Sequence, residues 1–473
     1  MLAMHIGINQ KKYFMKKIVL LGLLMFFSTN SFAQKKYRGM DFDDSSYSSI
    51  PKKAKLTRGL EIVPAAASLK KYAPTPLNQG DYGTCTSWAV AYCGRTIAEA
   101  VKNNWTDSNV INKNAYSAPF LFRLLRPQDT ICKGGSSIAD AFTILKEKGA
   151  LKVAATPGMC LPAVTSGQLE SASEFKIKDY LRLFDIEEGP QLKIQIVRKS
   201  INEKKPVVIG MLCPDSFQNC GEVWNPTEEP LPSYGGHAMC VVGYDDNKYG
   251  GAFEIQNSWG TSWGNKGYVW IKYADFVKFT KYAFQFVDLP EPKPQVPDLS
   301  GQIRLQLVDG TTMPVQSVVT ATNTTYATTT AYTYGTRFRI YISNNQPAYV
   351  YALSTDLSNE IVPIFPYDES ICAALTDSKN EVSIPDEDHF IQFDSKPGAD
   401  ILCVLYSRNA LNINELISKI AQQEGSFSDK INKVLGSQLV DQNNITYTSS
   451  SISFKGFSKG KTIIPLLVTM EHH

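Results

Sequence analysis

The stretch 79-QGDYGTCTSWAVAYCG-94 places a cysteine, Cys85, where a glycine turn becomes a run of helical character. A cysteine at the start of a helix lies at the positive end of the helix macrodipole, which favours the thiolate over the thiol. A structural cysteine is better placed inside the helix, as Cys93 is predicted to be. The stretch therefore predicts a nucleophile at Cys85, and a nucleophile needs a base and a group that orients the base.

His237 is the one histidine between the N-terminal leader and the proline-rich segment that divides the chain. It lies in 235-GGHAMCVVGYDD-246, a glycine-rich approach to a predicted buried strand. Asn257 follows another predicted strand twenty residues later, and Trp259 comes two residues after it. An asparagine amide can hold an imidazole in one tautomer, and a neighbouring indole can shield that bond from water. Taken singly, each feature also fits a structural histidine or a packed turn, but together they favour a base and its orienter.

Gln79 offers the remaining role, because it precedes the glycine turn by a few residues. Its side-chain amide could join the backbone N–H of Cys85 as an oxyanion hole, where one donor lowers an acylation barrier by roughly 3–4 kcal/mol. Each role then has one candidate: Cys85 as nucleophile, His237 as base, Asn257 as orienter and Gln79 as oxyanion donor.

On these motifs the chain resembles the papain-like cysteine peptidases over roughly residues 60–287. The motifs that carry the resemblance occur in the family's order, and they are 79-QGDYGTC-85, 132-CKGGSSIADAF-142, 236-GHAMCVVGYD-245 and 257-NSWGTSWGNKGY-268. The resemblance implies an α+β fold with a helical left lobe, a β-rich right lobe and an active site in the cleft between them. It also implies the four catalytic roles assigned above.

The resemblance extends to substrate binding. Gly134 and Gly135 match the glycine pair whose backbone pairs with the substrate chain, and Trp259 matches the tryptophan that covers the His–Asn contact. Gly236, directly before the histidine, completes the expected substrate-binding set. The resemblance implies neither a metal nor a cofactor.

Three departures from the family's pattern bear on these expectations. Tyr82 stands where the family has a cysteine, so Cys132 lacks its usual disulfide partner, and Cys160 is a candidate replacement. Thr86-Ser87-Trp88-Ala89 after the nucleophile is a variation associated with bacterial members. The family's long helical propeptide is missing, because residues 34–60 are too short for it, so zymogen control is doubtful or takes another route.

Residues 1–33 have the pattern of a secretory signal peptide. An apolar run from Ile18 to Phe27 follows Lys16 and Lys17, and Ser31-Phe32-Ala33 fits a cleavage site, with Met15 as the expected start. A membrane anchor is the alternative, but the run is short for one. Removing the leader's four lysines leaves 44 basic against 45 acidic residues, a net charge of −1. Nothing in that balance favours nucleic acid or an anionic membrane as a partner.

All nine cysteines lie after the leader. Secretion permits disulfides, and an odd number leaves at least one thiol unpaired. Cys213 and Cys220 could form a local bridge, and Cys372 and Cys403 could pair or lie in a core. A zinc site of Cys213, Cys220, His237 and Cys240 is a further alternative, although the spacing suits no common zinc knuckle.

The predicted domain order is a signal peptide at 1–33, a mobile arm or short pro-segment at 34–60, a papain-like domain at 61–288, a proline-rich linker at 289–301 and a β-rich domain at 302–473. The predicted elements of the papain-like domain are helices at 85–103 and 138–148 and strands at 206–212, 238–244, 252–256 and 267–273.

Residues 302–473 predict a mainly antiparallel β domain with helices near 412–423 and 429–435 and a last strand at 462–470. The domain more faintly resembles an uncharacterised bacterial module attached to peptidases and kinases, on 347-PAYVYALSTD-356, 363-PIFP-366 and 397-PGADILCVLYS-407. His389 is expected to be a solvated loop residue.

These observations predict a secreted or periplasmic cysteine peptidase that acts on peptide or protein substrates through a covalent acyl-enzyme. No cofactor, nucleic acid or stable membrane insertion after signal cleavage is expected, and the sequence leaves the oligomeric state open. The alternative is an inactive papain-like binding or scaffold protein that acts through its β domain.

Overall fold

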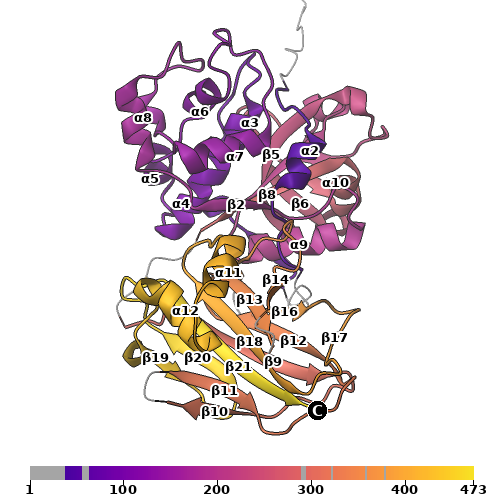
Figure 1. Ribbon diagram of the computed structural model, residues 1–473. Helices are drawn as coiled ribbons and strands as arrows, with labels where there is room; N and C mark the ends of the chain where they lie inside the picture. The colour runs from indigo at the N-terminus through magenta and orange to yellow at the C-terminus, as the bar shows by residue number, and fades with distance from the viewer. Residues whose placement is uncertain (1–37, 56–62, 289–294, 321–322, 357–359, 378–379) are drawn as a thin grey trace, which may run out of the picture.

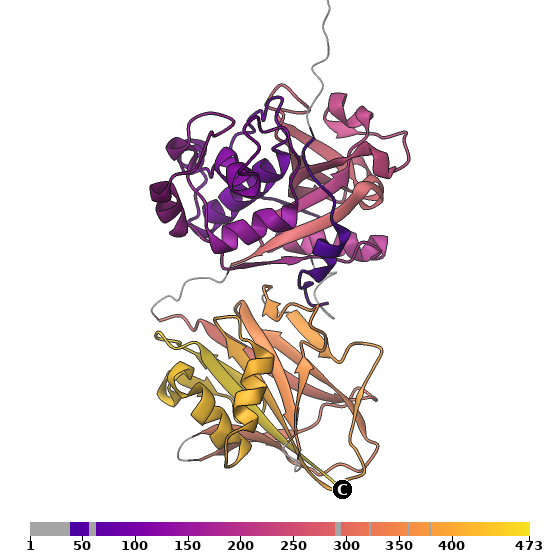
Figure 2. The same ribbon diagram turned by 45° about the horizontal axis from the view of Figure 1, so that its top comes forward.

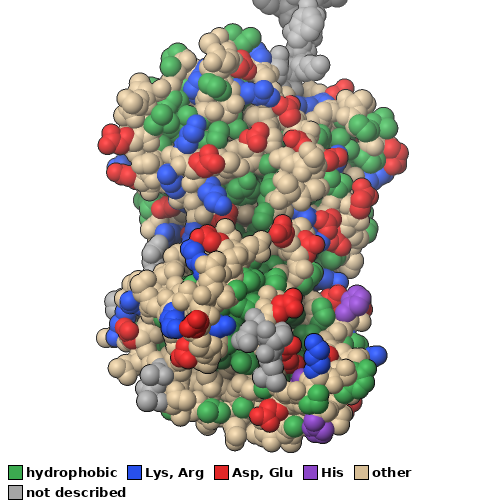
Figure 3. Space-filling view, in the orientation of Figure 1, with side chains coloured by type: hydrophobic (Ala, Val, Ile, Leu, Met, Phe, Trp, Pro, Cys, Tyr) green, Lys and Arg blue, Asp and Glu red, His purple; other side chains and the backbone are tan. Residues whose placement is uncertain are grey.

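The computed structural model describes residues 38–55, 63–288, 295–320, 323–356, 360–377 and 380–473, and it shows two stacked domains (Figure 1). The predicted leader at 1–33 and the first six residues of the predicted linker lie outside the described residues. Within the described part of the chain, no helix is long and apolar enough to cross a membrane. On the face drawn in Figure 3, basic and acidic side chains are interspersed over both domains.

Helices form one half of the N-terminal domain, on the left in Figure 1. Side chains at several helix starts cap the backbone: Ser117 accepts from the N–H of Phe120, and Ser137 accepts from the N–H of Asp140. The helices are α3 (Cys85–Ser87), α4 (Thr96–Lys102), α5 (Ser108–Lys113), α6 (Ala118–Leu125), α7 (Ile138–Glu147) and α8 (Ser166–Ser173).

The predicted helix at 85–103 is continuous, but it contains a π-helical stretch, Trp88–Arg95, between α3 and α4. Such stretches occur mainly at functional sites. Here the wide turn carries Gly94 against the sheet, where an added Cβ would lie 2.9 Å from side-chain carbons of Phe286 and Val208. The sequence periodicity gave no sign of this widening. The second predicted helix, at 138–148, matches α7 closely.

A mostly antiparallel sheet forms the other half, in the order β2-β8-β3-β5-β6-β7-β4, with β1 paired to β5. Its central strands are buried along almost their whole length, as apolar runs such as 207-VVIGML-212 require. The helices α9 (Pro190–Asn202) and α10 (Tyr273–Phe279) pack beside it. The strands are β1 (Ala66–Ser68), β2 (Asp179–Arg182), β3 (Val207–Leu212), β4 (Val223–Trp224), β5 (Gly236–Asp245), β6 (Ala252–Gln256), β7 (Tyr268–Lys272) and β8 (Thr280–Val287).

The C-terminal domain consists of two sheets with a shared apolar core, and the helices α11 (Ile413–Ala421) and α12 (Phe427–Leu435) lie at its front in Figure 1. One sheet has the order β10-β11-β21-β18-β13-β14 and the other β16-β12-β9-β20-β19. Pairing is antiparallel except between β11 and β21. The strands are β9 (Leu299–Leu307), β10 (Val315–Val319), β11 (Thr324–Thr328), β12 (Arg337–Asn344), β13 (Ala348–Thr355), β14 (Ile361–Phe365), β15 (Ala374–Leu375), β16 (Asn380–Ile384), β17 (Ile391–Gln392), β18 (Gly398–Ser407), β19 (Ile445–Tyr447), β20 (Ile452–Gly456) and β21 (Ile463–His472).

An N-terminal strap, residues 38–55, runs down the front of the N-terminal domain to the junction with the C-terminal domain (Figure 2). It contains the short helix α2 (Asp44–Ser49), which Asp43 caps. The side chains of Met40, Tyr47 and Ile50 are buried in the N-terminal domain. The sequence offered a mobile arm or a short pro-segment at 34–60. Residues 38–55 are packed rather than free, because the buried side chains of Met40, Tyr47, Ile50 and Ala54 anchor them, and the pro-segment stays a prediction.

Candidate active site

Cys85 is the first residue of α3, and its helix packs against β5, which carries His237. The side chain is fully buried. Burial raises the pKa of the Cys85 thiol to about 11, although hydrogen bonds from the backbone of Ala238 and Gly39 oppose the shift. The Sγ atom accepts a hydrogen bond of 3.1 Å from the N–H of Gly39, a strap residue. With this pKa the Cys85 side chain is a thiol at pH 7.

His237 is held from two sides. Its Nε2 lies 2.8 Å from Oδ1 of Asn257, and its ring stacks on Trp259 with 4.5 Å between the ring centroids. The antiparallel pairing of β5 and β6 places Cys240 opposite Gln256. Three residues before Cys240, His237 therefore lies beside the segment that follows β6, which contains Asn257 and Trp259. Burial lowers the pKa of His237 to about 4, and the bond with Asn257 only partly opposes this shift.

The second ring nitrogen of His237 has no hydrogen-bond partner among the described residues. Asn257 fixes Nε2, which leaves Nδ1 as the atom that could exchange a proton with a substrate or a thiol. His237 and Cys85 are thus a neutral imidazole and a neutral thiol, each on its own rigid element.

Gln79 is buried and tied to the turn that follows Asn257. Its backbone N–H donates to the Ser258 carbonyl at 2.8 Å, and its Oε1 accepts from the Ser258 hydroxyl at 2.6 Å. Its Nε2 donates to the Tyr82 carbonyl at 2.7 Å, within the loop that leads to Cys85. These bonds orient the amide so that its N–H end faces the nucleophile loop, and they leave its role as oxyanion donor a prediction.

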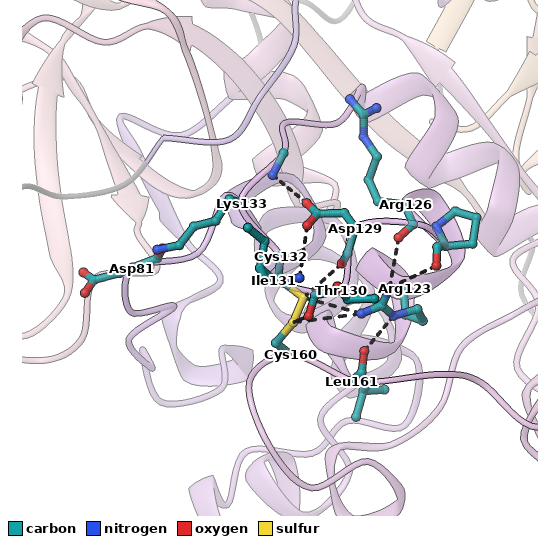
Figure 4. Close-up of a disulfide and its surroundings, with 12 residues drawn as sticks. Asp81, Arg123, Arg126, Asp129, Thr130, Ile131, Cys132, Lys133, Cys160 and Leu161 are labelled. Atoms are coloured by element: carbon teal, nitrogen blue, oxygen red, sulfur yellow. Dashed lines mark hydrogen bonds between the residues drawn. A yellow bond between two sulfur atoms is a disulfide. The ribbon is translucent and has the colours of Figure 1, made fainter.

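Gly134 and Gly135 follow a loop fixed by a disulfide between Cys132 and Cys160 (Figure 4). The buried Arg123 lies beside this disulfide, and its Nε donates to the Leu161 carbonyl at 2.6 Å. Cys160 is therefore the replacement partner that the sequence offered for Cys132. The side chain of Asp129 accepts from the N–H of Gly134 at 2.6 Å, which sets the direction of the glycine pair.

The chain matches two family models. Residues 76–283 match the papain family cysteine proteases, and residues 331–410 match a domain of unknown function, DUF4384. The N-terminal domain, which contains residues 76–283, is called the protease domain after this similarity. The second match agrees with an uncharacterised module in the C-terminal domain.

Curated relatives of the protease domain cover only part of the chain. The cysteine protease Amb a 11.0101 of Ambrosia artemisiifolia is 31% identical over 144 residues, which are 30% of this chain and 34% of that protein. The uncharacterized peptidase C1-like protein L477 of Acanthamoeba polyphaga mimivirus is 24% identical over 246 residues, which are 46% of this chain and 73% of that protein. The chain thus spans about a third of the first relative and about three quarters of the second.

Similar solved structures include xylellain, a cysteine protease from Xylella fastidiosa. It has 20% sequence identity and a TM-score of 0.43, and the match covers 54% of this chain and 96% of that one. Digestive procathepsin L 3 of Tenebrio molitor larval midgut has 18% identity and a TM-score of 0.39, and the match covers 50% of this chain and 76% of that one.

The strap covers the cleft of the protease domain between the helical half and β5. The N–H of Met40 donates to the Gly236 carbonyl at 3.4 Å, and the N–H of Asp41 donates to the Ser136 carbonyl at 3.1 Å. The N–H of Ser136 in turn donates to the Gly39 carbonyl at 3.0 Å. The strap thus makes backbone pairs at Gly236 and at Ser136, the residue after the glycine pair, and a substrate chain cannot reach Cys85 while it is seated.

Gly39 permits this close approach to the nucleophile loop. A Cβ added at Gly39 would lie 1.9 Å from the Gly83 carbonyl oxygen. Over Gly135, the Asp41 carboxylate takes the space that a side chain would need, and it pairs with Arg126 at 2.7 Å. Two glycines therefore allow the strap to fit the cleft: Gly39 in the strap and Gly135 in the protease domain.

The Met40 side chain is buried in an apolar cluster that also contains Cys85, Ile138 of α7 and Ala238 of β5. The thioether lies beside Gly210 of β3, and we call this position the Met40 pocket. A Cβ at Gly210 would lie 2.6 Å from Sδ of Met40, so this glycine makes room for the thioether. Sequence reasoning missed both the strap and this pocket, although Met40, Phe42, Tyr47 and Ile50 stand out as apolar residues in a polar segment.

The structure also bears on the alternatives offered for the other cysteines and for His389. Cys213 and Cys220 are free thiols, so they do not form the local bridge that the sequence left open, and Cys372 and Cys403 are buried free thiols of the C-terminal domain. Among the described residues, no group of three or more potential ligands could hold a metal ion, and His237 already binds Asn257. His389 is exposed and contacts Asp386.

Proposed function

We propose that this protein is a secreted bacterial cysteine peptidase with Cys85, His237 and Asn257 as its catalytic residues. The observation that carries the proposal is the fixed imidazole: Asn257 binds one nitrogen, Trp259 covers the ring, and the other nitrogen is left open on the strand that packs against the helix of Cys85. A papain-family domain over residues 76–283 supports the same chemistry.

The reaction begins when the strap leaves and water enters the cleft. Cys85 transfers its proton to Nδ1 of His237, and the resulting thiolate attacks the carbonyl carbon of a peptide bond. The oxyanion that forms accepts hydrogen bonds from the backbone N–H of Cys85 and from the amide of Gln79. Asn257 keeps the imidazolium in the orientation that this proton transfer needs.

The acyl-enzyme forms when the C–N bond breaks. His237 gives its proton to the leaving amine, and the acyl group stays on Cys85 as a thioester. His237 then takes a proton from water as the hydroxide attacks the thioester, and the thiolate leaves. The products are a carboxylic acid and an amine, and the enzyme returns to its starting state.

Export is part of the proposal. The leader at 1–33 would direct the chain to the periplasm or the medium, and a disulfide between Cys132 and Cys160 suits an oxidising compartment. Sequencing the N-terminus of protein recovered outside the cytoplasm tests this directly, and Gln34 is the expected first residue.

The activity is tested by the alkylation rate of Cys85 with iodoacetamide and by hydrolysis of a peptide library, both with a chain whose strap is displaced. Fast labelling well below pH 7 that depends on His237 is expected, together with turnover. Slow labelling that rises only near the free-thiol pKa of about 8.5, with no turnover, would favour the inactive scaffold instead.

A further inference from the structure

The strap does not end at the cleft. Past α2, its residues 51–54 enter the junction between the protease domain and the C-terminal domain, drawn at the waist in Figures 1 and 2. We call residues 51–54 the junction segment. It has contacts to both domains, and these include a buried ion pair.

The backbone of the junction segment is paired on both sides. Toward the protease domain, the N–H of Arg182 donates to the Pro51 carbonyl at 3.1 Å, and the N–H of Lys53 donates to the Arg182 carbonyl at 2.8 Å. Arg182 ends β2, the edge strand of the large sheet, so the junction segment continues that sheet by a short strand.

Toward the C-terminal domain, the same residues pair again. The N–H of Lys52 donates to the Ser370 carbonyl at 2.5 Å, and the N–H of Cys372 donates to the Lys52 carbonyl at 2.7 Å. The junction segment therefore lies between the two domains as a shared strand, and part of their docking runs through the strap.

A buried ion pair reinforces this position. Nζ of Lys53 lies 2.9 Å from Oδ2 of Asp377, with 6% and 2% of the two side chains exposed. Lys205 of the protease domain lies 3.6 Å from the other carboxylate oxygen. Burial alone would raise the pKa of Asp377, but Lys53 and then Lys205 overcome it and hold the pKa below its ordinary value. A charge at this depth is stable only with its partners in place.

Lys53 is the point where three parts of the molecule meet. Besides Asp377, its Nζ contacts the Ser200 hydroxyl and the Gln285 side-chain oxygen of the protease domain, each at 3.4 Å. The next residue, Ala54, is buried in the apolar core of the C-terminal domain. The C-terminal domain thus recognises the junction segment by backbone pairing, by charge and by apolar burial together.

We propose that the C-terminal domain is the binding module for the strap. Its contacts with the junction segment keep the N–H of Gly39 hydrogen-bonded to Sγ of Cys85. Its ligand is the extended basic segment 51-PKKAK-55 of this same chain. When these contacts are lost, the strap detaches at the junction segment and the cleft opens. The effect of the strap on peptidase activity rests on the function proposed above. The binding of the strap by the C-terminal domain is independent of that function.

The test uses the full chain and the variant Lys53→Gln, which removes the strap charge that pairs with Asp377 but leaves Asp377 paired with Lys205. Cys85 should be alkylated by iodoacetamide at least fivefold faster than in the unchanged chain. The amides of Met40 and Asp41 should exchange with deuterium faster by a similar factor, measured with Cys85→Ala added to prevent self-digestion.

The matched control is Glu381→Gln, which breaks the ion pair of 3.0 Å between Glu381 and Arg304, both in the C-terminal domain. It should leave both rates within twofold of the unchanged chain. Asp377→Asn is the second variant, and it should give at least the effect of Lys53→Gln. Thermal melting of each variant shows that the chain is folded before the rates are compared.

Unchanged labelling and exchange in folded Lys53→Gln and Asp377→Asn would overturn the proposal, as would an equal effect of Glu381→Gln. If labelling and exchange respond as expected but no variant hydrolyses peptides, the C-terminal domain retains the strap and it is the peptidase function that fails. The two proposals are therefore separable in one set of samples.

Discussion

The cleft and the junction are two buried polar sites covered by one strap, and they differ in whether their buried groups are charged. At the cleft, burial raises the pKa of Cys85 and lowers that of His237, so both groups are neutral at pH 7. At the junction, Lys53 and Lys205 keep Asp377 charged despite equal depth. The buried groups of the cleft are thus neutral, whereas Asp377 keeps its charge because the strap places the opposite charge of Lys53 beside it.

The largest effect should come from the cleft. Cys85→Ala in a chain with a displaced strap is expected to reduce kcat/KM for peptide hydrolysis by at least about 10³-fold, because the covalent step is lost. Peptide hydrolysis followed by fluorescence measures this, with thermal melting as the control for folding. Residual turnover near that of the parent chain would mean that Cys85 is not the nucleophile.

Gly39→Val should separate the two sites, because it acts on the cleft end of the strap alone. The added side chain meets the Gly83 carbonyl, and forcing such a clash costs about 1–3 kcal/mol, so Cys85 should be labelled roughly 10- to 100-fold faster. Gly167→Ala is the control, since a Cβ there meets nothing within 4 Å. No change in labelling would show that the strap leaves Cys85 accessible.

Acid should open the cleft before it disturbs the junction. The pKa of His237 is about 4 in the closed chain, below its ordinary value of 6.5, so its neutral form favours closure above pH 6.5 and this support is lost as the pH falls toward 4. The pKa of Asp377 is lowered, so its contribution is lost only below its ordinary value of 3.8.

Between pH 6.5 and 5, the amides of Met40 and Asp41 should therefore lose protection by about tenfold after correction for intrinsic exchange. Deuterium exchange of a Cys85→Ala chain measures this, and His237→Gln should abolish the pH dependence. A flat profile with His237 present would show that the imidazole does not sense the strap.

The smallest effect should come from the Met40 pocket. In Gly210→Ala the new methyl group presses on the end of a flexible thioether, so the strap should loosen by only about threefold in labelling rate. In a strap-displaced chain, the same change should favour peptides with smaller side chains at the position that enters this pocket. An unchanged side-chain preference would mean that substrates do not use the Met40 pocket.

Local sequence signals predicted the protease domain well. His237 on a strand and Asn257 after the next strand come together through antiparallel pairing of β5 and β6, which the alternating glycine-rich and apolar runs indicate. Cys85 at a helix start joins them because α3 packs against β5. The Cys132–Cys160 disulfide was open to prediction because Tyr82 excluded the usual partner. The boundaries of α7 and β6 follow from capping and turn residues in the same way.

Local sequence signals did not predict the packing of the strap against the two domains. Its burial depends on residues far away in the chain: Tyr47 stacks on Tyr282 with 4.4 Å between ring centroids, and Lys53 meets Asp377. A short polar segment with scattered apolar residues has no periodicity that would identify such partners. The π-helical stretch after Cys85 was missed for the same reason, because close packing at Gly94 rather than local propensity accompanies it.

The stacking of Tyr47 on Tyr282 has a practical consequence for handling the protein. Phe42 also packs edge-on against Tyr282, and Ile50 is buried nearby, so a chain without its strap presents a fresh aromatic and aliphatic surface to water. Contiguous apolar surface of this kind promotes self-association. The closed chain is the form to express, concentrate and store, and the open enzyme is best generated in dilute solution at the moment of assay.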